Sequence, residues 1–251
     1  MNRRCVPAFV VAALGWMAPG AATAGDPCAP MAADSAGVVS VRDARTAVLS
    51  DGRELRLAGI EVGGRGPEAL RALVDGQTLR LHHAPGTDRY GRLVAYATLP
   101  GATQTAQETL VAQGEALVSA RIGGKACAEA LFAGERAARA AKRGMWADPN
   151  SAPLRSENLA GLGAAAGHFA LVEGKVLSVR ESGAIIYMNF GRRWTRDFTV
   201  TVLKRQQRLF TDAGVDIKQL EGRRIRVRGW IERRGGPIVE AAAPEQIELI
   251  D

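Results

Sequence analysis

Histidine and cysteine, which carry much of the zinc-binding and nucleophilic chemistry of proteins, number only three each in this sequence of 251 residues. The three histidines form no zinc-ligand spacing, and no Ser/His/Asp or Cys/His motif supports nucleophilic catalysis. Arginine is abundant instead: it supplies 28 of the 33 basic residues, and the net charge is +7. Because the guanidinium fork matches phosphate oxygens, this composition favours anion recognition. An arginine surplus also arises from genome base composition, so charge alone leaves nucleic-acid binding undecided.

A basic run near the C-terminus is the first candidate binding surface. Residues 151–251 hold 16 basic and 12 acidic residues, and arginines alternate with apolar residues over 224–231. This alternation predicts a strand with one basic face. Such a face, with the charges and indole of 192–194, predicts weak binding of single-stranded nucleic acid through phosphate contacts and stacking. A solvated basic face without a ligand is the alternative. The residues assigned to the surface are Arg192, Arg193, Trp194, Arg223, Arg224, Arg226 and Arg228.

The first 24 residues have the pattern of a secretory signal peptide. Arg3 and Arg4 precede a mostly apolar stretch over 6–20, and Ala22-Thr23-Ala24 forms a small-residue cleavage site. The stretch is too short and too broken for a spanning helix, although an N-terminal membrane anchor is the alternative. We therefore expect an exported protein, periplasmic or secreted, with no membrane insertion after signal removal.

Cys28 and Cys127 are the cysteines that remain once the signal segment, with its Cys5, is removed. Two cysteines in an exported chain predict one disulfide. In the chain-entropy account, closing a loop of about 100 residues stabilises the fold by roughly 3–5 kcal/mol. Two free thiols are the alternative.

The elements that must position these residues fall into two β-rich units. In the first, Asp51-Gly52 is a hairpin turn, and Thr105 with Glu108 forms a capping box that opens a helix ended by Gly114. We expect strands over 37–41, 46–50, 54–60, 77–82 and 92–98, and further helices over 67–75 and 126–143. Five short strands with a helix after the third predict a small Greek-key barrel of the OB type.

A Pro- and Gly-rich stretch over 149–167 predicts a linker between the units. We expect strands beyond it over 171–179, 184–190, 198–203, 224–231, 238–241 and 246–250, with a helix over 204–213. This pattern also predicts an OB-like barrel. The expected organisation is therefore mainly β with α: a signal peptide over 1–24, a first domain over 25–148, the linker, and a second β domain over 168–251.

Five blocks in the first domain resemble the staphylococcal nuclease (thermonuclease) family. They read VRDART at 41–46, DGRELRLAGIE at 51–61, DRYGR at 88–92, LVAQG at 110–114 and RGMWADP at 143–149, and their order and spacing fit the family over 37–149. The resemblance implies an OB barrel with helices, which the strand pattern also predicts, and cleavage of DNA and RNA with Ca²⁺. In such chemistry two arginines brace the phosphate, carboxylates hold the ion, and a glutamate orients or deprotonates the attacking water.

The resemblance assigns the phosphate-bracing role to Arg56 and Arg92, and both arginines are kept. The family's set of metal ligands is not kept. The family pattern Asp-Gly-Asp-Thr falls on residues 43–46, so that Asp43 matches the first aspartate while Arg45 replaces the second, an ion ligand. The next ligand aspartate falls on Glu61. We expect Asp43 to be a turn residue that bonds its own backbone, and Arg45 to close an internal ion pair with a carboxylate in the place of the cation.

The catalytic glutamate of the family falls on Gly64, which has no side chain. Glu68 follows four residues later and is a weak substitute, because the first turn of a helix also favours an acid there. Loss of a ligand and of the glutamate together predicts a degenerate Ca²⁺ site.

Three functions remain open. The first is an exported thermonuclease-like protein that binds nucleic acid or another anionic ligand, with no cofactor. The second is an active phosphodiesterase that uses Ca²⁺ with altered ligands. The third is an envelope interaction module without a nucleic-acid role, which burial of the basic strand against the first domain would favour. The oligomeric state stays open.

Overall fold

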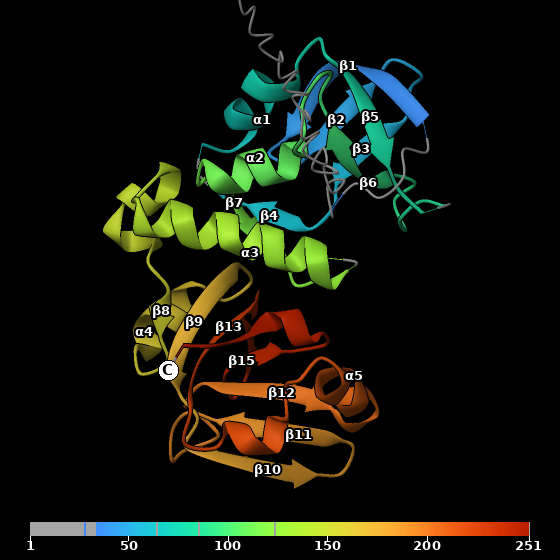
Figure 1. The fold of residues 1–251 in the computed structure, drawn as a ribbon. Coiled ribbons are helices and arrows are strands. Elements are labelled where there is room, and N and C mark those ends of the chain that lie inside the picture. The colour runs from blue at the N-terminus through green and yellow to red at the C-terminus, as the bar shows by residue number, and fades with distance from the viewer. Residues whose placement is uncertain (1–27, 29–33, 64, 85, 123, 251) are drawn as a thin grey trace, which may run out of the picture.

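The computed structural model describes residue 28 and residues 34–63, 65–84, 86–122 and 124–250. Two hydrophobic cores organise the chain, one built from residues between 28 and 131 and the other from residues between 162 and 247. We call these the first and second units. Figure 1 shows helix α3 (Lys125–Ala140) lying between them, on the lower side of the first unit.

Five strands of the first unit close into a barrel in the order β1-β2-β3-β6-β5. They are β1 (Asp34–Asp43), β2 (Thr46–Leu49), β3 (Glu54–Leu57), β5 (Thr78–His82) and β6 (Leu93–Thr98). β3 and β6 run parallel, and β5 pairs with the beginning of β1 to close the ring. Alternation along the strands buries Leu55, Leu57, Leu79 and Leu81 inside. The predicted OB-type barrel is confirmed.

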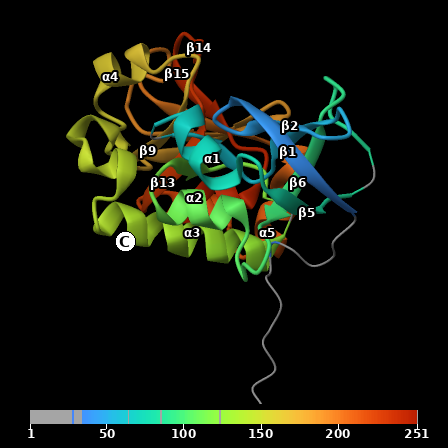
Figure 2. The same ribbon diagram turned by 90° about the horizontal axis from the view of Figure 1, so that it is seen from above.

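Helices α1 (Pro67–Val74), α2 (Ala106–Ala112) and α3 complete the first unit. The predicted capping box opens α2: the Thr105 hydroxyl accepts the Glu108 N–H at 3.2 Å, and the Glu108 carboxylate accepts the Thr105 N–H at 2.8 Å. Figures 1 and 2 both show α2 running beside α3.

A small sheet of β4 (Ile60–Val62) and β7 (Ala116–Val118) links the barrel to these helices. The sequence pattern predicts one strand over 54–60, but the chain turns at Gly59 instead. Gly59 has a φ of 71°, and a Cβ there would lie 2.3 Å from the Tyr96 hydroxyl, so both the turn and the close packing require glycine. Glu61 lies on β4, and this turn therefore positions it beside the barrel.

Cys28 and Cys127 form the predicted disulfide, with an S–S distance of 2.07 Å. Both residues are buried in the first core. The bond ties the segment before β1 to α3.

The second unit contains two sheets, ordered β10-β11-β12-β15-β14 and β16-β13-β9-β8. Its strands are β8 (Leu154–Arg155), β9 (Phe169–Lys175), β10 (Ser178–Ser182), β11 (Ile185–Asn189), β12 (Thr199–Leu203), β13 (Arg224–Trp230), β14 (Glu232–Arg234), β15 (Gly236–Glu240) and β16 (Ile247–Leu249). β12 runs parallel to β15, as β3 does to β6 in the first barrel. β13 runs antiparallel to β9. Among the described residues no ladder joins the two sheets, so the predicted second barrel is not present as a closed barrel.

Short helices connect these strands. They are η1 (Gly144–Ala147), η2 (Pro149–Ser151), α4 (Leu159–Ala164), η3 (Lys204–Gln206), α5 (Gln207–Asp212), η4 (Ile217–Leu220) and η5 (Pro244–Gln246). The helix expected over 204–213 is present as η3 followed by α5. In the described part of the chain, no helix has the length and apolar character needed to cross a membrane.

The expectation of a linker over 149–167 is wrong. β8 pairs with β9, and α4 places Leu162 fully buried in the second core. The Asn158 side chain accepts the Gly161 N–H at 3.0 Å and caps α4. Proline, glycine and alanine predict a flexible connection only where no apolar side chain anchors the segment, and Leu162 is such an anchor.

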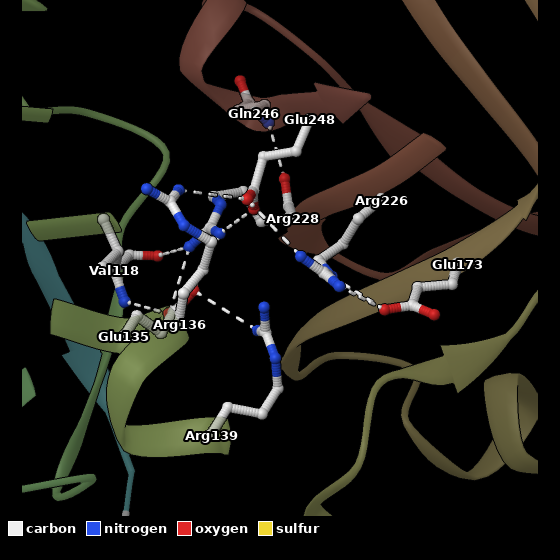
Figure 3. A network of polar contacts seen from close by, with 9 residues as sticks. All are labelled: Val118, Glu135, Arg136, Arg139, Glu173, Arg226, Arg228, Gln246 and Glu248. Atoms are coloured by element: carbon white, nitrogen blue, oxygen red, sulfur yellow. Dashed lines mark hydrogen bonds and ion pairs between the residues drawn. The ribbon is translucent and has the colours of Figure 1, made fainter. Parts of the chain in front are cut away.

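A buried ion network joins the two units (Figure 3). Arg228 of β13 is 0% exposed and donates to the two carboxylate oxygens of Glu135 on α3, at 3.2 and 2.9 Å. It also donates to the Val118 carbonyl oxygen at 2.9 Å, and it pairs with Glu248 of β16. Burial opposes the charge of Arg228, but attraction to Glu135 and Glu248 outweighs it and raises the guanidinium pKa above its usual value.

The same network corrects the predicted basic face of β13. Arg226 pairs with Glu173 at 2.7 Å and with Glu248 at 3.4 Å, and its side chain is only 12% exposed. Neither Arg226 nor Arg228 is therefore available to nucleic acid. The alternation placed them correctly on one face, but on that face Arg228 packs against the first unit and Arg226 is held by carboxylates of β9 and β16.

Apolar side chains extend this interface. A third buried cluster joins Leu171 of β9 to three residues from the first part of the chain, Leu117, Ala138 and Trp146. Met145 and Phe169 pack against this cluster.

We predict that Arg228→Ala lowers the free energy of unfolding by about 3–5 kcal/mol, because it leaves the Glu135 carboxylate buried without its main partner. Arg233→Ala, at an exposed arginine of the neighbouring strand β14, serves as the control and should change it by less than about 0.5 kcal/mol. Urea denaturation measures both. If both substitutions changed the free energy of unfolding by the same small amount, the network would contribute little to stability.

Candidate anion-binding site

A cavity of about 730 Å³ opens where the first barrel meets the second unit. One wall comes from the first unit and includes both predicted phosphate-bracing residues, Arg56 and Arg92, together with Arg45 and Glu61. The opposite wall comes from the end of β13, from β14 and from β15. The fold thus collects the residues named by the resemblance in one cleft, and it adds a second wall that the resemblance does not contain.

Arg45 forms the predicted internal ion pair. Its guanidinium contacts the Glu61 carboxylate and donates to the Ile60 carbonyl oxygen at 3.1 Å. Both charged side chains are nearly buried, with 13% of Arg45 and 11% of Glu61 exposed. The turn at Gly59 brings β4 back beside the loop that follows β1, and this places the two residues together.

Asp43 does not join the cluster. Its carboxylate accepts the backbone N–H of Arg45 at 2.9 Å, which is the turn role expected from the sequence. It lies outside the residues that line the cleft.

Burial raises the pKa of the Glu61 carboxyl, and the neighbouring charges of Arg45 and Arg56 oppose this effect only in part. The Ser119 hydroxyl also donates to Glu61, at 3.4 Å. Glu61 is therefore held by Arg45 and Ser119, and it has little capacity left for a cation.

The described residues do not provide a Ca²⁺ site. They contain no group of three or more His, Cys, Asp or Glu side chains that could hold a metal ion. Ca²⁺ takes six to eight oxygen ligands, whereas Glu61 is a lone carboxylate in contact with a guanidinium. The family's dependence on Ca²⁺ thus does not fit the residues at this position.

The weak candidate Glu68 lies elsewhere. It is exposed in the first turn of α1, with Arg71 at 3.9 Å, and it does not line the cleft. Gly64 lies outside the described residues. Among the described residues, the carboxylates that the first unit contributes to the cleft, Glu61 and Asp88, are both paired with arginine, and the others in the lining, Glu232 and Glu240, belong to the second unit.

Arg92 is firmly held by Asp88. Its Nε and Nη2 donate to one carboxylate oxygen at 2.9 and 2.7 Å, and the other oxygen accepts the Tyr90 and Arg92 N–H groups. The hydrogen bond from Arg92 lowers the Asp88 pKa to about 2. Arg89 and Arg92 also lie 4.7 and 4.9 Å from the centre of the Tyr90 ring. The charge of Arg92 is therefore largely compensated.

Arg56 has a different environment. Within the described ranges, no side chain forms a hydrogen bond or ion pair with its guanidinium, which is half-buried and lines the cleft. Burial lowers its pKa, and so do the charges of Arg45 and Arg92. A bound anion would relieve this repulsion, so Arg56 is the strongest candidate to hold one.

The second predicted surface does not form as a unit. Arg192, Arg193 and Trp194 are exposed between β11 and β12, and the indole is 72% exposed. Arg192 and Trp194 line a separate hollow with Arg180 and Leu177. Arg223 and Arg224 lie at the start of β13, where Arg223 is exposed and Arg224 is half-buried. With Arg226 and Arg228 buried in the interface, this surface loses its central charges.

The sequence analysis missed the residues that the second unit adds to the cleft, above all Trp230 and Glu232. It also missed Ser119 and Arg121, which follow β7. Trp230 continues the alternation of β13 and looks like any strand residue, so only the packing of the two units reveals its place.

We predict that the native protein binds no Ca²⁺ at about 1 mM, whereas Arg45→Asp creates a site with a dissociation constant of roughly 1 mM or below. The substitution removes the guanidinium and adds a carboxylate beside Glu61. Arg42→Asp, an equal charge change at an exposed position of β1, is the control and should gain no site. Calorimetry and the Ca²⁺-dependent change in melting temperature measure both. Tight Ca²⁺ binding by the native protein would contradict the assignment.

Comparison with known proteins agrees with this geometry. Residues 55–148 match the family model described as staphylococcal nuclease homologue. A search of curated proteins finds no match to the chain. The matched region contains Arg56, Glu61 and Arg92, and it spans β5, β6, nearly all of β3 and helices α1 to α3, whereas β1 and β2 precede it. Within the first unit, residues 55–148 are therefore similar to the staphylococcal nuclease homologue family.

Proposed function

We propose that this protein binds nucleic acid or another phosphate-bearing anion at Arg56 and does not hydrolyse it with Ca²⁺. One observation carries the proposal: Arg45 pairs with Glu61 beside Arg56, which itself has no partner in the described chain. The nuclease-type domain supports membership in a class of nucleic-acid-binding and phosphodiesterase proteins.

The charge arrangement explains why binding would survive without the ion. In a metal-dependent site, a divalent cation and the arginines together attract the phosphate. Here the Arg45 guanidinium is paired with Glu61, and Arg56 and Arg92 line the same cleft. A phosphate would still meet positive charge, although a cation would meet the like charge of Arg45.

Hydrolysis needs a further group that the chain lacks at the expected position. An attacking water must lose a proton to a positioned base. Gly64 cannot supply one, and Glu68 lies outside the cleft. An active nuclease would have to recruit another carboxylate, and this makes binding without turnover the better-supported function.

A second candidate function is an envelope interaction module without a nucleic-acid role. The positions of Arg226 and Arg228 favour it, because Arg228 holds the two units together and Arg226 is paired within the second unit. In this case the second unit would serve a partner through its remaining exposed surface, and the cleft at Arg56 would bind no nucleic acid.

We also propose that the protein is exported. The pattern of residues 1–24, which lie outside the described residues, is typical of a signal peptide, and the Cys28–Cys127 disulfide is suited to an oxidising compartment. N-terminal sequencing of the protein from its native host should give Gly25 as the first residue. A start at Met1 in a membrane fraction would favour an anchor instead.

We predict that Arg56→Ala weakens binding of a labelled single-stranded oligonucleotide at low salt by roughly 10–100-fold, as expected for a lost charge-assisted hydrogen bond. Arg80→Ala, at an exposed arginine of β5 outside the cleft, is the matched control and should change binding little. Fluorescence anisotropy at several salt concentrations measures both, and binding should weaken steeply as salt rises.

The same oligonucleotide distinguishes the alternatives. Incubation with Ca²⁺, Mg²⁺, Mn²⁺ or chelator should leave it intact. Ca²⁺-dependent cleavage that is lost in Arg56→Ala would establish an active nuclease. Absence of binding to the native protein at low salt would favour the interaction module.

A further inference from the structure

The structure assigns a single nucleotide to this cleft, either free or at the unpaired end of a strand, with its phosphate on Arg56 and its base stacked on Trp230 of the second unit. This inference rests on the proposed function and specifies its ligand. The determinant of specificity is then a residue outside the nuclease homologue domain.

The two walls of the cleft differ in charge. The first unit contributes five arginines and two carboxylates to the lining, and the carboxylates of Glu61 and Asp88 are paired with Arg45 and Arg92. The remaining positive charges of this wall are those of Arg56, Arg89 and Arg121. The second unit contributes two carboxylates, Glu232 and Glu240, and no lysine or arginine among the described lining residues. A phosphate is therefore directed to the first wall, and a group that is uncharged or donates hydrogen bonds is directed to the second.

Trp230 is the aromatic group of the second wall. About half of its surface, 49%, is exposed, although it lies at the end of a strand next to the buried network. Phe169 packs against its ring edge-to-face, with centroids 6.2 Å apart, and the two residues are paired across β9 and β13. An indole that is held in place and left open to a cleft is suited to stacking on a base.

The size and the charge of the cleft limit the ligand. A volume of about 730 Å³ lies within the range of sites for small molecules and cofactors. The carboxylates of Glu232 and Glu240 would repel the phosphates of a second strand. Glu232 shares its charge with Arg234 at 2.8 Å, whereas Glu240 is exposed and forms no ion pair with another described residue. A duplex should therefore be excluded.

The buried network fixes the distance between the walls. Arg228 lies two residues before Trp230 on β13 and is bonded to α3 through Glu135. Separation of the walls would expose this pair, at a cost of several kcal/mol. The second unit thus acts as a fixed wall, and the cleft does not widen for a larger ligand.

The test measures binding of four probes to the chain from Gly25 to Asp251. The probes are a 5′-phosphorylated single-stranded tetranucleotide, an abasic phosphodiester of the same length, a blunt hairpin duplex and phosphocholine. We expect Trp230→Leu to weaken binding of the tetranucleotide about 5–150-fold, the equivalent of one lost stacking contact, and to leave binding of the abasic chain unchanged. Trp230→Phe should retain most of the affinity, and the hairpin should bind at least about 10-fold more weakly than the tetranucleotide.

Leu209→Ala is the control, because this apolar side chain is exposed in the second unit but lies outside the cleft. It should not change the affinity for any probe. Arg56→Ala should weaken binding of the tetranucleotide and the abasic chain alike, and this separates the phosphate contact from the stacking contact. Melting temperatures establish that each variant is folded, and Trp230→Phe keeps the contact with Phe169 if Trp230→Leu does not fold.

Each remaining outcome overturns the inference in a distinct way. If Trp230→Leu leaves tetranucleotide binding intact while Arg56→Ala weakens it, the phosphate site stands and the stacking assignment is wrong. If Trp230→Leu weakens binding of both chains equally, Trp230 is only structural. Tighter binding of phosphocholine than of the tetranucleotide would identify a zwitterionic ligand held by the indole and the carboxylates. Absence of binding to all four probes would reject the proposed function itself.

Discussion

The buried ion pair between Arg228 and Glu135 is the constraint on which the arrangement of the molecule depends. A guanidinium and a carboxylate removed from water are costly unless each finds its partners, and this pair obtains them only when β13 lies against α3. The Val118 backbone supplies both a carbonyl oxygen for Arg228 and an N–H for Glu135. The geometry is therefore specific, and it fixes one relative placement of the two units, which an apolar contact alone would define less strictly.

This placement creates the cleft and also determines what the second unit cannot do. Arg228 of β13 contacts the first unit and Arg226 pairs with Glu173 of β9, so both serve contacts within the protein and not a ligand. The end of the same strand places Trp230 in the lining of the cleft that contains Arg56. A strand that looked like an independent binding surface instead becomes one wall of a site shared by both units.

The pair between Arg45 and Glu61 follows the same rule on a smaller scale. A nearly buried carboxylate needs a positive partner, and a metal ion or a guanidinium can fill that need. Once arginine occupies the position, the carboxylate is satisfied within the chain, and affinity for a cation is no longer required for stability. The site then depends on Arg56, whose charge the described chain leaves without a partner.

The sequence by itself determined the elements and several pairings. Alternation and turn residues predicted the five barrel strands and the Thr105 capping box, because these depend on neighbouring residues. They predicted the β-rich character of the second unit but not its division into two sheets. The two cysteines that follow the signal segment predicted one intramolecular disulfide. Arginine in place of the family's aspartate predicted an ion pair between Arg45 and a carboxylate, which is that of Glu61. Tertiary structure alone decided which faces are covered. Alternation places Arg226 and Arg228 on one side of a strand, but whether that side meets water or α3 depends on packing between residues about 90 apart in sequence. For the same reason, local patterns did not show that Leu162, in the segment expected to be a linker, is buried in the second core. Nor did they show that Trp230 lines the cleft.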